Sequence, residues 1–126
     1  MQQNKIVFKI GSVELTAIAR DTPTAKLILN ALPIHSSAQT WGDEIYFSIP
    51  VDSQLESDAR DVVNPGEIAF WVEGSCIAIG FGPTPISQSD EIRLAAATNI
   101  WADAEEDVRK LVNAHSQDSV IVDWYR

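Results

Sequence analysis

A stretch rich in aromatic residues, Thr40–Pro50, contains the best candidates for a binding surface. Polar and apolar residues alternate from Glu44 onward, which predicts a β-strand. In a strand, Glu44, Tyr46 and Ser48 would share one face, and the three apolar residues that alternate with them would face the core. Aromatic rings around a few polar groups are typical of small-molecule and peptide pockets. Trp41, Glu44 and Tyr46 are therefore the first candidate ligand-binding residues.

Four residues outside this stretch are candidates for the same site: Trp71, Phe81, Thr84 and Asn99. Trp71 would complete an aromatic wall with Glu44 as its polar anchor. Phe81 and Thr84 flank a Gly-Pro turn, and binding residues often lie on such loops. Asn99 lies near the end of an apolar segment and would line the same opening. The alternative is structural, because tryptophan and tyrosine often fill cores and turn chemistry alone explains glycine and proline.

The sequence indicates neither a metal site nor a cofactor site, and no catalytic residue is assigned. The single cysteine, Cys76, cannot form an internal disulfide, and His35 and His115 are far apart in the sequence. These residues do not have the spacing of a metal-binding motif. Cys76 has no basic neighbour and precedes an apolar run, so we interpret it as a buried, unreactive thiol.

The charge balance argues against nucleic acid and membrane surfaces as partners. Nine Lys and Arg residues against eighteen Asp and Glu residues give a formal net charge of −9. Such a chain would be repelled by phosphate backbones and by anionic lipids. The acidic residues are spread along the chain, which is typical of a solubilising surface. An acidic surface of this kind is compatible with a cationic partner.

Length and composition predict one soluble domain over residues 1–126. The chain has 126 residues, of which 45% are hydrophobic and 21% charged, and these values suit a globular protein with one core. No segment approaches the roughly 18 apolar residues that a transmembrane helix needs, and the N-terminus has no apolar signal segment. We therefore expect a cytoplasmic protein, and homo-oligomer formation stays possible.

Turn signals and apolar periodicity predict a mainly β protein. Gly11-Ser12 would join two strands in a hairpin. Thr22 and Pro23 suit the start of a helix that ends at Leu32. The expected strands are residues 5–10, 13–19, 44–49, 67–72, 76–81, 91–101 and 119–125.

The remaining segments are expected to be loops and a second helix. Residues 35–39 are interpreted as a polar connector, 52–61 as an exposed loop and 82–85 as a loop that leaves the sheet. Asp103 and Glu106 have the spacing of a capping box, which predicts a helix that buries Val108 and Leu111. Two helices with about seven or eight strands imply a closed sheet with helices at its ends.

This order of elements resembles the cyclophilins. Thr22-Pro23-Thr24-Ala25 is similar to the start of their first helix, and the hairpin from Gly66 to Ile79 resembles their strand pair that ends in a Gly-Ser-Gln-Phe-Phe-Ile run. Thr40–Phe47 and Phe81–Ser87 together resemble a family of small prokaryotic cyclophilin-like proteins without an assigned activity. The resemblance covers nearly the whole chain. It implies a closed eight-stranded β-barrel with two short helices that cap its ends.

The resemblance does not extend to the isomerase residues of the cyclophilins. These enzymes use an arginine on the strand after the first helix and a phenylalanine-lined proline pocket. Here Glu44 lies near the expected position of the arginine, and Ala78 replaces a phenylalanine of the pocket. A carboxylate offers acceptors where the reaction needs donors. We therefore expect a module that binds a small ligand or an extended peptide, with peptidyl-prolyl isomerase as the alternative and an oligomeric scaffold as a third class.

Overall fold

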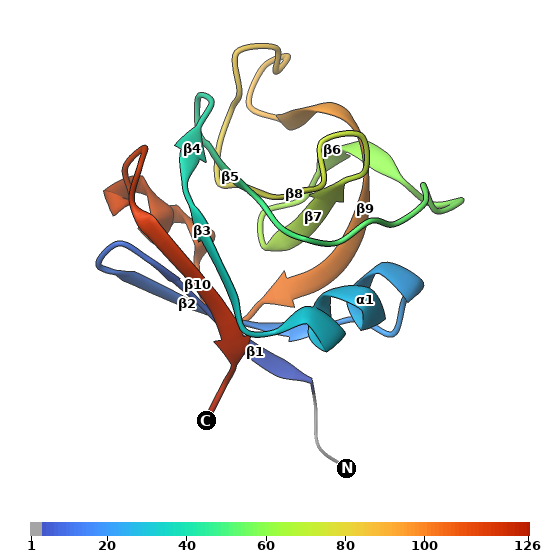
Figure 1. Ribbon diagram of the computed structural model, residues 1–126. Coiled ribbons are helices and arrows are strands. Elements are labelled where there is room, and N and C mark those ends of the chain that lie inside the picture. The colour runs from blue at the N-terminus through green and yellow to red at the C-terminus, as the bar shows by residue number, and fades with distance from the viewer. Residues whose placement is uncertain (1–3) are drawn as a thin grey trace.

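The computed structural model describes residues 4–126 and is built mainly of antiparallel β-strands (Figure 1). Nine of its strands form one continuous path of neighbours, and a tenth pairs with β9 from outside that path. The strands are β1 Lys5–Ile10, β2 Val13–Ala19, β3 Ile34–Ser37, β4 Gln39–Thr40, β5 Glu44–Ser48, β6 Arg60–Val63, β7 Glu67–Trp71, β8 Cys76–Gly80, β9 Ile92–Ala104 and β10 Ser119–Trp124.

The first hairpin and the first helix form where the sequence predicts them. Gly11 between β1 and β2 has φ +58°, a conformation that glycine adopts without strain. Helix α1, Pro23–Ala31, begins after Thr22, whose side chain accepts a hydrogen bond from the backbone N–H of Ala25 at 3.1 Å. This cap satisfies one of the free N–H groups of the first turn.

The barrel closes through one short segment, residues 34–40. β3 pairs with β10, and β4 pairs with β5, while only Ala38 separates β3 from β4. The two ends of the sheet order β3-β10-β1-β2-β9-β7-β8-β5-β4 are therefore joined by the chain itself. With β3 and β4 taken as one crossing strand, the path gives the eight-stranded barrel that was expected. The interpretation of residues 35–39 as a connector is wrong, because their backbone pairs although their side chains are mostly polar.

Alternation along the strands fills the barrel interior. Ile45 and Phe47 of β5 are fully buried in the main core. The ring of Phe8 contacts those of Phe47 and Trp101 at centroid distances of 6.5 Å and 6.1 Å. Ile28 of α1 packs into the same core from an open end of the barrel. The face prediction for β5 is therefore confirmed.

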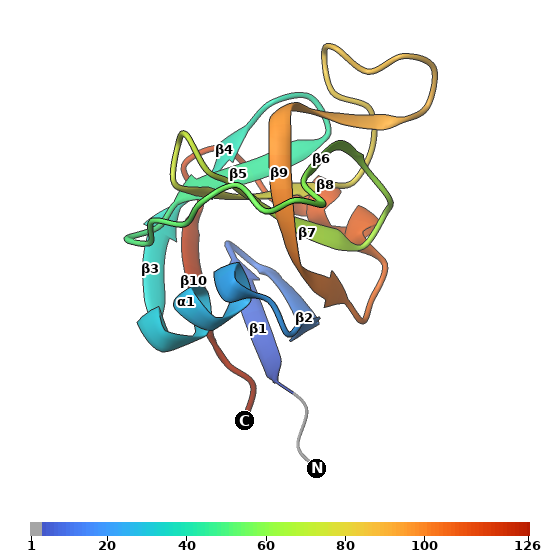
Figure 2. The ribbon, with the colours of Figure 1, turned by 90° about the vertical axis from the view of Figure 1, so that its right-hand side faces the viewer.

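The first half of β9 leaves the barrel wall and pairs with β6. Ile92, Arg93 and Thr98 pair with β6, whereas the later part of β9 pairs with β7 and β2 (Figure 2). We call residues 92–98 the overhang. Beneath it lies a second, smaller cluster of buried apolar side chains, formed by Val63, Ala69, Ala78, Ile92, Leu94 and Ile100. The outer face of β7 and β8 is thus covered rather than exposed.

Two expectations about loops and helices need correction. Residues 60 and 61 belong to β6, where Arg93 holds Asp61 at 2.9 Å, so the predicted loop ends earlier. The second helix is a short 3₁₀-helix, η1 Val108–Asn113, capped by Asp107.

The predicted capping box is wrong because the side chains of both acids bind residues far away in the sequence. The Asp103 carboxylate accepts two hydrogen bonds from Arg20, and Glu106 accepts one from the backbone N–H of Thr16 at 2.9 Å.

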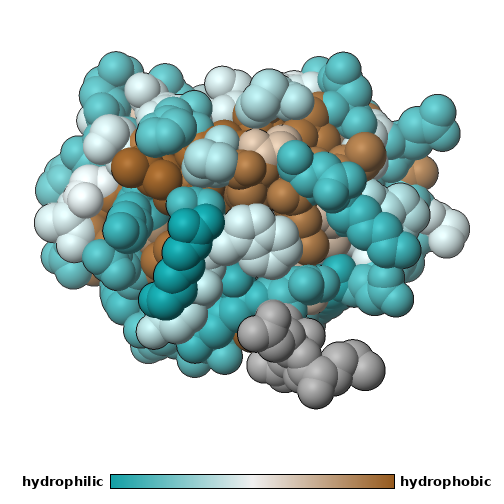
Figure 3. Space-filling model, turned by 60° about the horizontal axis from the view of Figure 1, so that its bottom comes forward, coloured by the Kyte–Doolittle hydropathy of each residue, from teal (hydrophilic) through white to brown (hydrophobic). Residues whose placement is uncertain are grey.

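Exposed apolar side chains are spread over several segments. The face seen from the end of the molecule with the C-terminus is mainly hydrophilic, with an apolar area in its middle (Figure 3). The large exposed hydrophobic residues are Leu27, Leu55, Ile86, Val112, Trp124 and Tyr125. No helix within residues 4–126 is long and apolar enough to cross a membrane.

Candidate functional site

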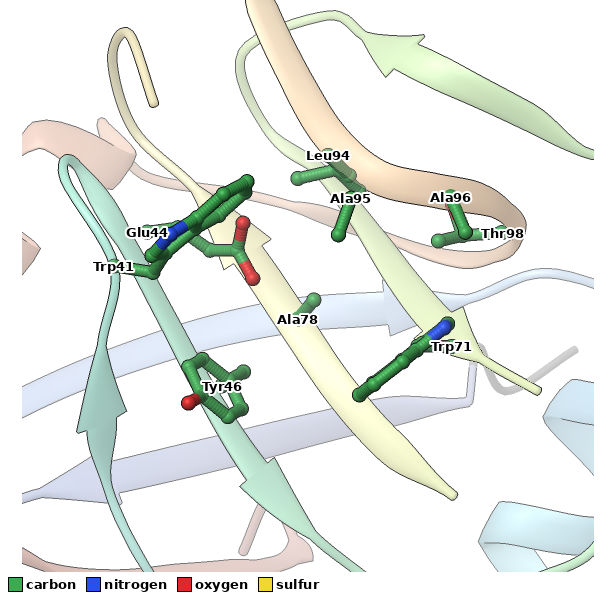
Figure 4. A pocket seen from close by; sticks show the side chains of 9 residues that line it. All are labelled: Trp41, Glu44, Tyr46, Trp71, Ala78, Leu94, Ala95, Ala96 and Thr98. Carbon is green, nitrogen blue, oxygen red and sulfur yellow. The ribbon is translucent and has the colours of Figure 1, made fainter. Parts of the chain in front are cut away.

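A pocket of about 190 Å³ lies between the outer face of the barrel wall and the overhang. Trp41, Tyr46 and Trp71 supply its aromatic surface, and Glu44 is its one charged lining residue (Figure 4). The rest of the lining is Ala78, Leu94, Ala95, Ala96 and Thr98. We call this cavity the Glu44 pocket.

Strand pairing places Glu44 and Tyr46 at the pocket. Glu44 lies opposite Gly80 of β8, and Tyr46 lies opposite Ala78. These two small residues leave space on the outer face of the wall. A Cβ atom at Gly80 would collide with Ile92, so glycine allows the overhang to approach. Ala78 lies between the carboxyl group of Glu44 and the ring of Trp71 (Figure 4).

Trp41 is positioned by a turn that the loop after β8 supports. The backbone N–H of Trp41 donates to the carbonyl of Glu44 at 3.0 Å. Gly42 has φ +59° and packs directly against Thr84 and Pro85, so a side chain there would be both strained and blocked. The loop and the turn are also joined by the N–H of Asp43, which donates to the carbonyl of Pro83 at 3.0 Å.

Trp71 lies across the pocket from Glu44, at the end of β7 (Figure 4). Its ring packs over Gly74, where a Cβ atom would collide with it. The indole nitrogen of Trp71 is buried and has no hydrogen-bond partner among residues 4–126. An unpaired buried N–H group is costly to folding.

Glu44 has the most unusual environment of the pocket residues. It is only 6% exposed, and its Oε1 atom has no hydrogen-bond partner among the residues that the structure describes. Burial disfavours the charged form and raises its pKa to about 7. A carboxyl group at this pKa accepts or releases a proton near neutral pH. Perturbed groups of this kind cluster at functional sites.

Glu67 shows how a second buried carboxylate is held in its charged form. Arg60 and Arg20 donate to it at 2.7 Å and 3.2 Å, and the N–H of Asn64 donates at 2.8 Å. Burial would raise the pKa of Glu67, but these hydrogen bonds together hold it below the ordinary value. Arg93 is engaged by Glu91 and Asp61. No arginine lines the Glu44 pocket.

Three of the seven sequence candidates do not line the pocket. Phe81 is buried in the main core. Thr84 binds Ser87 and the carbonyl of Arg93, so it fixes the loop that supports Trp41. Asn99 is fully buried and holds the loop before β6: it accepts from the N–H of Glu56 at 2.8 Å and donates to Thr24 and Gln54. The structure brings together Trp41, Glu44, Tyr46 and Trp71.

The residues of the overhang and of the pocket floor are not among the candidates predicted from the sequence. Ala78 and the alanines at 95 and 96 carry no chemical group that would mark them as binding residues. These small side chains leave space for a ligand. In the sequence this space is indicated by the run of small residues from Ala95 to Ala97 and by Ala78, which replaces a phenylalanine of the cyclophilin pocket.

A wider groove of about 870 Å³ begins on the other side of Tyr46. It runs between β3 and β5, and its lining includes His35, Ser36, Ser48 and Cys76. Burial, together with the nearby charge of Glu44, raises the pKa of the Cys76 thiol. Within residues 4–126 no group of three or more His, Cys, Asp or Glu residues is arranged to hold a metal ion.

Comparison with known proteins places this geometry in a family. The cyclophilin-like family model matches residues 4–123. The solution structure of a hypothetical protein from Archaeoglobus fulgidus is similar to this chain, with 34% sequence identity and a TM-score of 0.84. The match covers 98% of this chain and 95% of the archaeal one. No curated protein matches the chain. The chain therefore belongs to the cyclophilin-like family.

Proposed function

We propose that this protein binds a small ligand in the Glu44 pocket. The observation that carries the proposal is a buried carboxyl group whose Oε1 atom has no hydrogen-bond partner among residues 4–126, in a cavity with three aromatic side chains. An unpaired buried polar atom costs about 1–3 kcal/mol of folding free energy. A ligand that pairs with Glu44 would offset this cost in the bound state.

The volume of the pocket supports a small occupant. Pockets that bind drug-sized ligands measure roughly 300–1,000 Å³, and the Glu44 pocket measures about 190 Å³. An extended peptide would need more surface, and the groove beyond Tyr46 supplies it. Tyr46 lines both cavities, so a peptide could place one side chain in the pocket and continue along the groove.

Filling the pocket is expected to abolish ligand binding. Ala78→Leu adds a branched side chain at the pocket floor, whereas Ala97→Leu adds the same atoms on β9 at a residue that does not line the pocket. In a thermal-shift screen of small molecules, compounds that stabilise the wild type should lose their effect on Ala78→Leu and keep it on Ala97→Leu. If folded Ala78→Leu protein responds to every compound as the wild type does, the proposed location is wrong.

Peptidyl-prolyl isomerase activity is the alternative, and we expect none. The pocket presents Glu44 and no arginine, so it lacks the donor that the resemblance to cyclophilins would require. In a protease-coupled assay with X–Pro peptides, the rate should equal the uncatalysed rate at every protein concentration. A rate that rises with protein concentration in the wild type and is absent in Ala78→Leu would contradict this expectation.

The cytoplasmic location and the possible homo-oligomer stay proposals. The single cysteine suits a reducing compartment, where a free thiol persists. The exposed aromatic residues Trp124 and Tyr125 at the C-terminal end are the first surface to examine for self-association. Light scattering measures the oligomeric state directly.

A further inference from the structure

The electrostatics of the Glu44 pocket restrict the charge of its ligand. Glu44 is the one ionisable acid or base among the lining residues apart from the phenol of Tyr46, and no Lys, Arg or His lines the cavity. An anionic ligand would meet an acidic wall on a chain with a formal net charge of −9. A neutral ligand could form a hydrogen bond with Glu44 in either of its forms, but it would leave the negative charge of the carboxylate uncompensated. Only a cation is attracted both by the Glu44 carboxylate and by the net negative charge of the chain.

The aromatic side chains favour the same kind of ligand. The faces of tryptophan and tyrosine rings carry negative potential, and they attract ammonium groups that lie over them. Trp41 and Tyr46 flank the carboxyl group of Glu44, and Trp71 lies on the opposite side of Ala78 (Figure 4). A ligand above Ala78 would thus contact aromatic surface on both sides. The cavity of about 190 Å³ excludes large cations.

We propose that the ligand of the Glu44 pocket is a small organic ammonium ion, paired with the Glu44 carboxylate and surrounded by Trp41, Tyr46 and Trp71. This proposal rests on the ligand-binding function of the pocket and names the chemical class of the ligand. The ammonium ion belongs either to a free amine or to the side chain of a lysine in a peptide that continues along the groove beyond Tyr46.

Ligand binding is then coupled to the release of a proton. The pKa of Glu44 is about 7 in the free protein because of burial. The other titratable side chains on the adjacent strands are Tyr46 of β5 and Cys76 of β8, while β7 and the overhang contribute no titratable side chain to the lining. An ammonium ion needs the carboxylate, so below pH 7 it must displace a proton. Its affinity should fall about tenfold between pH 8 and pH 6.

The test is a titration with n-butylammonium chloride and with neutral 1-butanol, which has the same number of non-hydrogen atoms. Binding is followed by NMR at the indole N–H signals of Trp41 and Trp71, at constant ionic strength and at pH 8, 7 and 6. The wild type, Glu44→Gln and Ala78→Leu are compared. Capped lysine, N-acetyl-lysine N-methylamide, is titrated in parallel to distinguish the two sources of the ammonium group.

We expect butylammonium to bind the wild type at least tenfold more tightly than 1-butanol at pH 8, and about tenfold more weakly at pH 6 than at pH 8. Glu44→Gln should lose both the preference and the pH dependence. Tighter binding of capped lysine than of butylammonium assigns the ammonium group to a peptide, and equal or weaker binding assigns it to a free amine.

Equal affinity for butylammonium and 1-butanol in the wild type, or unchanged butylammonium binding by Glu44→Gln, would overturn the ammonium proposal. If 1-butanol binds the wild type and not Ala78→Leu, the pocket is a ligand site and only the chemical class is wrong. If no compound distinguishes the wild type from Ala78→Leu, the proposed function fails as well.

Discussion

Glu44→Gln is expected to stabilise the free protein by about 3 kcal/mol at pH 8 and to have little effect at pH 4. The pKa of Glu44 rises from 4.5 to about 7 because burial disfavours the charged form. The unfolded chain therefore loses its proton first, and the stability of the folded state falls as the pH rises from 4.5 to about 7. Above about pH 7 the folded state bears the full free-energy cost of the buried Glu44 charge. Glutamine has nearly the same shape and no charge, so it avoids the cost.

Urea unfolding of the wild type and Glu44→Gln at pH 8, 7, 6, 5 and 4 measures this difference. The advantage of the variant should shrink steadily as the pH falls. Glu14→Gln is the matched control, because Glu14 lies exposed on β2 and outside the pocket. An advantage of Glu44→Gln that is the same at pH 8 and pH 4 would show that burial of the charge is not its cause.

This cost supports the proposed ligand-binding function of the Glu44 pocket. Groups that cost the folded state about 3 kcal/mol at neutral pH are typical of strained or desolvated active and binding sites. Pairing the Glu44 carboxylate with a ligand cation would recover the lost stability. The most stabilised variant is thus expected to be the one that loses its ligand.

Asn99→Asp is expected to destabilise the protein by about 3 kcal/mol or more at pH 7. Asn99 is fully buried, and its amide group donates at 2.8 Å to the carbonyl of Gln54 and at 2.9 Å to Thr24. Aspartate would place an oxygen against the Gln54 carbonyl and a negative charge near Glu56, whose N–H group Asn99 now binds. The hydrogen bond from the Glu56 N–H would remain, but one such bond does not offset the repulsion and the burial of the charge.

The matched control is Asn113→Asp, because Asn113 is exposed in η1 and makes one long hydrogen bond at 3.4 Å. Chemical denaturation of both variants at pH 7 gives the comparison. Asn113→Asp should remain within about 0.5 kcal/mol of the wild type. A similarly small effect for Asn99→Asp would contradict the role of Asn99 as the anchor of the loop before β6.

Residues whose burial follows a regular period could be predicted from the sequence. The alternation in β5 indicates that Glu44 and Tyr46 share the face opposite Phe47, and the structure places both on the outer wall. The cap that Thr22 forms on α1 is equally local, because Thr22 and Pro23 adjoin the helix that they start. The fold class follows from such signals and from the resemblance to cyclophilins.

Interactions between distant parts of the chain could not be predicted. The segment 35–39 pairs with neighbouring strands through its backbone, and its mostly polar side chains form no apolar pattern that would mark a strand in the sequence. Asp103 has the spacing of a helix cap, yet it binds Arg20, which lies 83 positions away in the sequence. The sequence predicts that Asn99 lines the pocket, but in the structure its side chain holds the loop before β6. The overhang depends on a change of pairing partner within β9, and nothing in an uninterrupted strand sequence marks that change.

The central claim is that Glu44 is a neutral-pH carboxyl group poised for a cationic ligand. The most direct measurement is its pKa, from the ¹³C chemical shift of the Glu44 carboxyl carbon titrated between pH 4 and 9. The midpoint should lie near 7 in the free protein. In saturating n-butylammonium it should fall by at least one pH unit. A midpoint near 4.5 in the free protein, or one that the amine does not move, would contradict the account.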